Sequence, residues 1–200
     1  MPAADQRARL LDAAISRFAI KGIAATSLRD IATEAGVTPA LPHYYFGDKA
    51  QLVDAVIEER LMPLFADLRA PLQAAGDDIA ELVAGFVIGI GRLVARHPWL
   101  PSLWVREVLS EGGALRDLLV GRMAPQVPHL LAQRFAAAQR EGRLNPDLDP
   151  RLLVVSLVGL TLFPAAGAPI WRRIFDADDL DADALRLHTL ALLDRGLEVK

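Results

Sequence analysis

Hydrophobic residues recur every three or four positions along nearly the whole chain, which is the period of an amphipathic α-helix. The first segment shows this clearly, with five positions on one helical face: Leu11, Ala14, Ile15, Phe18 and Ala19. No segment of the sequence alternates hydrophobic and polar residues as a half-buried strand does, and it has no internal repeat. The pattern therefore predicts an all-α protein.

Capping residues, glycines and prolines divide this pattern into separate helices. Ser27 is expected to open the second helix, with Asp30 completing a capping box three residues later. Pro39 and Pro150 suit the first position of a helix, because the amide hydrogen that proline lacks is left unbonded there. The expected N-cap residues are Asp5, Ser27, Thr38, Asp48 and Asp149.

The later helices are bounded by glycine and proline. After a long fourth helix that begins at Asp48, we expect helices at 78–95, 99–110, 113–140, 150–163 and 182–198. Pro63, Pro125 and Pro128 are expected to kink or break their helices locally. This order predicts a small domain of short helices at 1–47, followed by a larger helical domain at 48–200.

Residues 152–171 form a run without a charged side chain. A membrane span needs about 20 apolar residues. Pro164, Gly167 and Pro169 are expected to cut this run and leave a helix that ends near Phe163. We therefore expect a buried helix, sealed by the core or by another subunit, and no membrane. Charged residues near the N-terminus argue against a signal peptide, so a cytoplasmic location is expected.

Composition narrows the possible chemistry. The 200 residues are 52% hydrophobic and 24% charged, which suits a folded globular protein, and none is cysteine. Disulfides and thiolate metal sites are therefore excluded. The net charge of −3 is unusual for a protein that binds nucleic acid. Residues 1–50, however, hold six basic and five acidic side chains, so a nearly neutral first segment precedes an acidic remainder.

Residues 27–46 fit a helix–turn–helix, the unit that places its second helix in the major groove of DNA. Ala32 supplies the small residue where the two helices touch, and Gly36 supplies the turn between them. The residues spaced to fill the small core are Ile31, Ala35, Val37 and Tyr45.

This region resembles the signature of the TetR family of transcriptional regulators. The resemblance rests on GIAATSLRDIA (22–32), AGVT (35–38) and HYYFGDK (43–49). A weaker similarity, in HPWL (97–100), RE (106–107) and PDLDPR (146–151), is to the C-terminal domain of the CecR-like branch. The resemblance implies a repressor that binds a palindromic operator in double-stranded DNA as a homodimer and is released by a small-molecule inducer.

The resemblance also implies which side chains touch DNA. Ser27 and Thr38 are equally explained as helix caps, and Tyr45 as part of the small core. Arg29 and Lys49 are the better candidates, because we expect them to have no duty inside the fold. The full set of candidate DNA-binding residues is Ser27, Arg29, Thr38, Pro39, Ala40, His43, Tyr44, Tyr45 and Lys49.

The chain departs from the family at Pro42, where Leu, Ile or Val is usual. Proline there removes an amide and crowds the Thr38 carbonyl, so we expect a distorted or re-aimed recognition helix. Between Thr38 and Tyr45 there is no Arg, Lys, Asn or Gln, the side chains that read bases bidentately. This suggests specificity through contacts to thymine methyl groups and through DNA shape.

For the larger domain the resemblance implies an inducer site and a four-helix dimer interface. The charge-free helix and the last helix, with Leu190, Leu193 and Leu197 on one face, are the candidate dimer surfaces; alternatively both complete the internal core. The candidate ligand-binding residues are aromatic, basic or thioether side chains; such aromatics are more often ordinary core, and such charges are more often solvated or paired. They are Phe65, Phe86, Arg92, Trp99, Trp104, Arg106, Met123 and Phe163.

The sequence carries no signal for catalysis. No Gly-rich phosphate loop, paired-histidine helix or nucleophile motif is present. The acidic run at 176–183 lacks the glycine and glutamate of a calcium loop and suits the N-terminus of the next helix. We expect no enzyme, no metal and no cofactor. An activator, a family member that has lost DNA binding, and an all-α carrier or enzyme that does not bind DNA remain alternatives.

Overall fold

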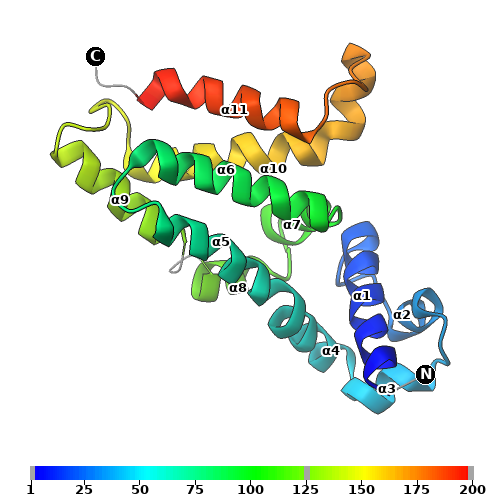
Figure 1. The fold of residues 1–200 in the computed structure, drawn as a ribbon. Helices are drawn as coiled ribbons and strands as arrows, with labels where there is room; N and C mark the ends of the chain where they lie inside the picture. Colours follow the sequence, from blue (N-terminus) through cyan, green and yellow to red (C-terminus); the bar gives the residue numbers. More distant parts are fainter. Residues whose placement is uncertain (1–2, 124–126, 198–200) are drawn as a thin grey trace. The chain divides into compact units, whose positions relative to one another are not determined.

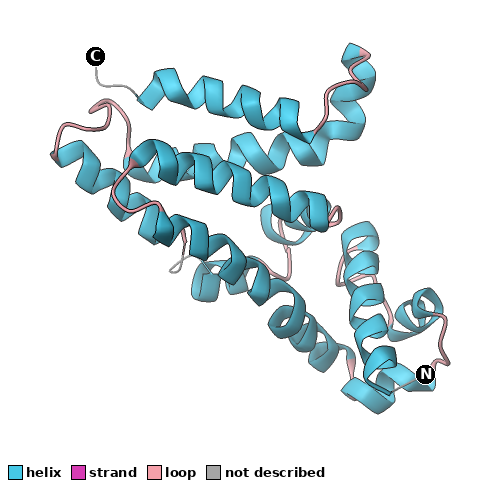
Figure 2. Cartoon of the chain, in the orientation of Figure 1, coloured by secondary structure: helices cyan, strands magenta, loops and turns pink. Residues whose placement is uncertain are grey.

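The computed structural model describes residues 3–123 and 127–197. These residues form helices and loops and contain no strand, so the predicted all-α class is confirmed (Figures 1 and 2). The α-helices are α1 (Ala3–Lys21), α2 (Leu28–Ala35), α3 (Ala40–Phe46), α4 (Lys49–Val56), α5 (Met62–Ala74), α6 (Ile79–Arg96), α7 (Leu100–Trp104), α8 (Arg116–Leu118), α9 (Pro128–Arg140), α10 (Pro150–Phe175) and α11 (Ala182–Leu197). The π-helical segments are η1 (Ile57–Leu61), η2 (Val105–Leu109) and η3 (Leu119–Met123).

The chain forms two compact units. The first consists of residues 1–64 and 102–119, and the second of residues 65–101 and 120–200. The first unit therefore includes a segment that lies in the middle of the sequence, around η2. The domain boundary expected at residue 47 stays a prediction.

The first unit is built on α1, which packs against α2 and α4. All five positions of the expected apolar stripe on α1 are buried, with Leu11 and Ala14 fully so. Ile31 and Ala32 of α2 are also fully buried. Gly36 ends α2 with φ of +64°, the left-handed conformation that glycine adopts most easily, so the expected turn of the helix–turn–helix is confirmed.

Most of the predicted caps are confirmed. The Ser27 and Asp30 capping box is present, and Asp48 and Asp149 cap α4 and α10. Asp5 is not a cap, because α1 begins at Ala3 and places Asp5 in its first turn. The prediction of Thr38 as the cap of α3 was wrong, because Pro39 is the cap residue and the helix begins one residue later.

The helix expected over 99–110 is present from Leu100 to Leu109 but changes its hydrogen bonding halfway, and the helix expected over 113–140 is divided, in agreement with the break expected at Pro128. The first range divides into α7 and η2, and the second into α8, η3 and α9, with Pro128 at the start of α9. Pro125 lies outside the described residues.

The fourth helix also changes its hydrogen bonding, because Pro63 has no amide to give the Glu59 carbonyl. The Met62 amide bonds instead to Ile57 five residues back, which produces η1. This agrees with the local break expected at Pro63.

The expectation that the charge-free helix ends near Phe163 was wrong. α10 continues for 26 residues through Pro164 and Pro169. Pro164 leaves the Leu160 carbonyl without its helical donor, and the Thr189 hydroxyl of α11 donates to that oxygen at 3.4 Å. The Trp171 indole N–H donates to the Pro164 carbonyl at 2.8 Å. By length and composition α10 could cross a membrane, and little of its apolar stretch is buried within the chain.

The second unit is built around α6, which packs against α9, α10 and α11 (Figure 1). Its apolar face carries Leu82, Val83, Phe86 and Val87, all at most 3% exposed. Asp181 caps α11 by accepting the Ala184 amide at 2.8 Å, which supports the capping role expected for the acidic run before this helix.

Candidate nucleic-acid interface

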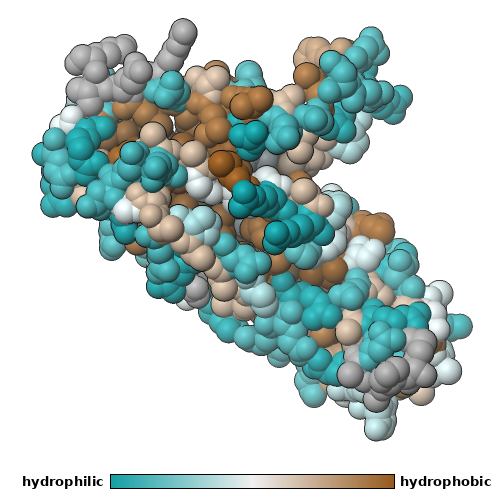
Figure 3. Space-filling model, viewed as in Figure 1, coloured by the Kyte–Doolittle hydropathy of each residue, from teal (hydrophilic) through white to brown (hydrophobic). Residues whose placement is uncertain are grey.

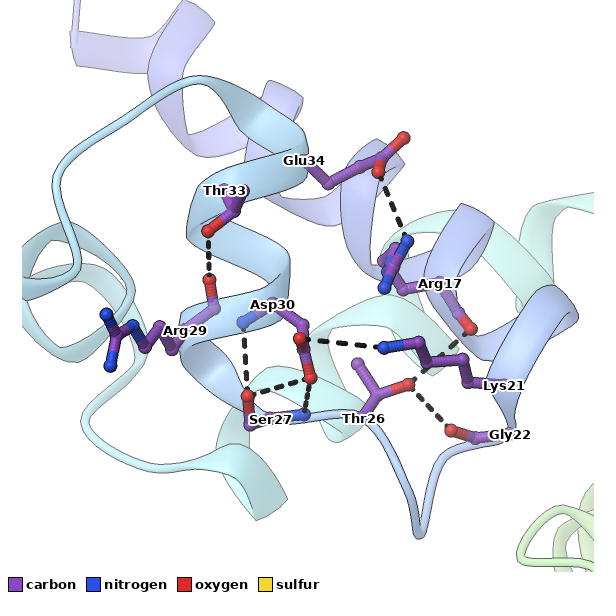
Figure 4. A network of polar contacts seen from close by, with 9 residues as sticks. All are labelled: Arg17, Lys21, Gly22, Thr26, Ser27, Arg29, Asp30, Thr33 and Glu34. Atoms are coloured by element: carbon purple, nitrogen blue, oxygen red, sulfur yellow. Dashed lines mark hydrogen bonds and ion pairs between the residues drawn. The ribbon is translucent and has the colours of Figure 1, made fainter.

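The N-terminus of α2 is held by a closed network around Ser27 (Figure 4). The Ser27 hydroxyl donates to Asp30 Oδ2 at 2.8 Å and accepts from the Asp30 amide at 3.1 Å. The Ser27 amide donates to the same carboxylate at 3.0 Å. These hydrogen bonds, with a smaller contribution from the charge of Lys21, lower the pKa of Asp30. Because the Ser27 hydroxyl is engaged, the geometry favours its role as a cap.

Arg29 is the free cation of α2. Its side chain is exposed and forms no hydrogen bond or ion pair with the residues that the structure describes, and in Figure 4 it points away from the Ser27 network. Two neighbouring cations are paired, Lys21 with Asp30 at 3.7 Å and Arg17 with Glu34 at 3.6 Å. Arg29 therefore has its charge available for a phosphate or a base edge, as its sequence position suggested.

The start of α3 presents small and apolar groups to solvent. Thr38, Pro39 and Ala40 are all exposed, and Tyr44 is 80% exposed. The half-buried Tyr45 ring lies 5.1 Å from the Tyr44 ring and 6.3 Å from the ring of the buried Phe46, centre to centre, so one side of Tyr45 contacts the small core. His43 Nδ1 lies 2.9 Å from the Gly47 carbonyl at the end of the helix, which leaves Nε2 toward solvent.

Pro42 does not break α3. The helix runs without interruption from Ala40 to Phe46, and Pro42 is buried. The amide that Pro42 lacks belongs to the first turn, and the Thr38 carbonyl receives the Leu41 amide at 3.0 Å instead. Proline can therefore take the buried position at low cost.

The expectation that Lys49 has no duty inside the fold was wrong. Its ammonium donates to the Ala24 carbonyl at 2.9 Å and joins the loop before α2 to the start of α4. An ammonium has three donors, so a phosphate contact is compatible with this bond and stays a prediction.

Glu107 has a structural function that sequence reasoning missed. It is buried in the first unit, where Oε1 accepts the Ile23 amide at 2.8 Å and Oε2 accepts the Ala114 amide at 3.1 Å. Arg106 Nε donates to the Ala19 carbonyl at 3.4 Å. In the sequence, the only indication of this structural function was that Arg106 and Glu107 are charged residues within the mostly apolar segment 99–110. Arg106, a candidate ligand residue, is exposed and bonds to a backbone carbonyl of the first unit, which favours the alternative of a solvated charge.

The remaining ligand candidates are spread over both units. Trp104 belongs to the first unit, and Phe65, Phe86, Arg92, Trp99 and Phe163 to the second. Phe86 is 2% exposed and forms part of the core, whereas Phe163 is 72% exposed on α10. The side chain of Met123 lies outside the described residues. Ligand contacts by these residues stay a prediction.

Comparison with known proteins agrees with this geometry. Residues 10–56 match the family of bacterial regulatory proteins called tetR, and residues 80–194 match the tetracyclin repressor-like C-terminal domain. The chain is 32% identical over 191 residues to the HTH-type transcriptional repressor Rv3405c of Mycobacterium tuberculosis, covering 96% of this chain and 88% of that protein.

Two solved structures share the fold. The ketosteroid transcriptional regulator KstR2 of Mycobacterium tuberculosis has a TM-score of 0.77 at 23% identity, over 97% of this chain and 95% of that one. The regulator FadR of Bacillus subtilis in complex with stearoyl-CoA has a TM-score of 0.71 at 19% identity, over 96% and 99%. The CecR-like branch stays a prediction. On the two matched regions and the full-length relative, the chain belongs to the TetR family of transcriptional regulators.

Proposed function

We propose that this protein is a ligand-responsive repressor that binds a palindromic operator as a homodimer and leaves it when a small-molecule inducer binds. The observation that carries the proposal is the unbroken α3, whose exposed first turn lies in the same compact unit as the free Arg29. The repressor name of the 32% identical relative supports the direction of regulation.

The proposed DNA contacts follow the geometry of the first unit. Arg29 supplies charge. The Leu28 and Arg29 amides in the first turn of α2 have no acceptor among the described residues and can bind a phosphate, whereas the Asp30 amide is already bonded to the Ser27 hydroxyl. Tyr44 and the exposed methyl group of Ala40 face the edges of the DNA bases. His43 and Lys49 contact the DNA backbone on either side. Because α3 offers no bidentate side chain, the operator is read through thymine methyl groups and DNA shape.

The proposed dimer forms through α10. Its exposed large apolar residues recur at helical spacing and would be costly to leave in water. Hydrophobic surface of the second unit is visible in Figure 3. On α11, Leu193 is buried in the internal core, whereas Leu187 and Leu192 are exposed, so α10 supplies the main dimer surface and α11 can extend it. The stripe consists of Leu152, Val155, Phe163, Ile170 and Ile174.

Dimerisation also accounts for the apolar length of α10 without a membrane. A second copy of the same helix covers the stripe in a symmetric, isologous interface. The protein is then cytoplasmic, where a regulator meets its operator.

Selection from a random pool of duplex DNA tests the proposal. We expect enrichment of a two-fold-symmetric site whose half-sites lie about one helical turn apart. A strict guanine requirement under α3 would refute the proposed readout. If no sequence is enriched, the protein does not bind DNA specifically and the repressor function is wrong.

A further inference from the structure

A cavity of 170 Å³ lies in the second unit between α6, α10 and α11. Most of its wall is aliphatic, with Ile90 and Val94 from α6, Leu160 from α10 and Leu185 from α11. An engineered cavity of about 150 Å³ in another protein admits benzene, so this one has room for a molecule of that size. The open space reaches α6, because a Cβ atom added at Gly91 would meet nothing within 4 Å.

The wall also contains Arg172, whose charged guanidinium has an N–H group without a hydrogen-bond acceptor. Its Nη2 donates to the Leu180 carbonyl at 2.7 Å, and its guanidinium lies 5.4 Å from the centre of the Trp171 ring. Its Nε is buried and has no hydrogen-bond partner. A buried N–H without an acceptor is costly, and the charged guanidinium makes that cost larger.

The other charged residues of the wall, Arg186 and Asp181, have partners at α11, but Asp181 keeps its negative charge, which an anionic ligand has to avoid. Arg186 Nε pairs with Asp183 at 3.2 Å, and Asp181 accepts the Ala184 amide as the cap of α11. Arg172 forms no ion pair with any described carboxylate, although four aspartates stand close in sequence at 176–181. The cavity thus combines an apolar wall with one cation, Arg172, that has no ion pair with a described carboxylate, and one carboxylate, Asp181, that caps α11.

The proposed dimer leaves this cavity open. At 100° per residue, the exposed stripe of α10 is centred on Leu152, Phe163 and Ile170. Of the cavity residues on α10, Thr161, Ala168 and Arg172 fall on the opposite side of the helix, while Leu160 and Trp171 fall between that side and the stripe. A second copy that covers the stripe therefore does not fill the cavity.

We infer that this cavity binds a small carboxylate with a compact apolar body, of the size of benzoate, and that Arg172 holds the carboxylate. The ring or short chain fills the space beside Gly91, and the carboxylate accepts from the guanidinium. The inference names the chemical class of the inducer, and in that respect alone it rests on the proposed function.

Calorimetric titration of the full-length protein tests the site without DNA. The probes are benzoate, the neutral isostere benzamide, and inorganic phosphate. We expect benzoate to bind about 10- to 100-fold more tightly than benzamide, as a charge-assisted hydrogen bond implies. Phosphate should bind weakly, because it has no apolar body.

Two variants test separately what the charge of Arg172 and the volume of the cavity contribute to benzoate binding. Arg172→Met should weaken benzoate binding by a factor of at least about 10. Gly91→Leu, which fills the cavity and keeps Arg172, should abolish it. Gly91→Ala is the matched control, because it makes the same gain in helix propensity, adds one methyl group and should retain binding. Circular dichroism verifies that each variant is folded.

Three results would overturn the site: no benzoate binding at millimolar concentration, equal affinity for benzamide, or wild-type binding by Gly91→Leu. A separate titration with the selected operator addresses the inducer role, since benzoate should lower DNA affinity in wild-type protein and not in Gly91→Leu. Benzoate binding with unchanged DNA affinity would retain the site and overturn its role as the inducer site.

Discussion

The buried carboxylate of Glu107 accepts the backbone amide of Ile23 at 2.8 Å, across 84 residues of sequence. Its second oxygen accepts the Ala114 amide at 3.1 Å. One side chain thus joins the turn between α1 and α2 to η2 and the loop that follows it. The turn holds the start of α2, so Glu107 helps to set the position of the helix–turn–helix within the first unit.

Replacing Glu107 should destabilise the first unit. Glu107→Ala leaves two buried amides without an acceptor, at a cost of about 1–3 kcal/mol each. Glu107→Gln keeps one acceptor oxygen and should lose less. Thermal unfolding followed by circular dichroism measures the effect, and Glu111→Ala, at an exposed glutamate nearby, is the control. Equal melting temperatures for wild type and Glu107→Ala would show that these hydrogen bonds contribute nothing net.

Replacing Arg29 should affect operator binding alone, whereas replacing Lys49 should affect both operator binding and stability. Arg29→Ala should weaken operator binding and reduce the salt dependence of the affinity, with unchanged stability, because the side chain has no partner among the described residues. Lys49→Met should lower both affinity and stability, since it also removes the bond to the Ala24 carbonyl. Anisotropy titrations and melting curves check both effects. A loss of stability in Arg29→Ala would contradict this assignment.

The folding stability of the first unit should decrease at acidic pH. Hydrogen bonds from Ser27 lower the pKa of Asp30, and those from Arg7 lower the pKa of Glu59, from ordinary values of 3.8 and 4.5. Folding therefore favours the ionised forms, whose contribution is present above these ordinary values and is lost as pH falls through the lower folded values. Denaturant midpoints should decrease as pH falls below 4.5.

The variants Asp30→Asn and Glu59→Gln test the source of this dependence. Each should be less stable than wild type at neutral pH and should lose less stability in acid. Asp54→Asn, at an exposed aspartate of α4, is the control and should follow the wild-type profile. If all four proteins show the same pH dependence, other groups are responsible.

A charge on the α10 stripe should disrupt the dimer. Val155 is 65% exposed in the single chain, and Val155→Glu would bury a carboxylate in the proposed interface. Light scattering at micromolar concentration should give a dimer for wild type and a monomer for the variant. Val120→Glu is the matched control at 66% exposure and should remain dimeric. A monomeric wild-type protein would overturn the proposed interface.

The sequence was most informative where local chemistry decides the structure. The apolar stripe of α1, the Ser27 capping box and the left-handed Gly36 each depend on residues within a few positions, and all were predicted. The continuation of α10 was missed, because the donor that satisfies the Leu160 carbonyl comes from Thr189 on another helix. The partners of Lys49 and Glu107 were missed for the same reason, since both bonds join distant parts of the chain.

Titration of the selected operator with wild-type protein and Val155→Glu tests the central claim most directly. Fluorescence anisotropy at two salt concentrations gives the stoichiometry and the salt dependence of the affinity. We predict two protomers per symmetric duplex, affinity that falls as salt rises, and much weaker binding by Val155→Glu. Binding that does not distinguish the selected duplex from a scrambled one would contradict the account of this protein as a dimeric, sequence-specific repressor.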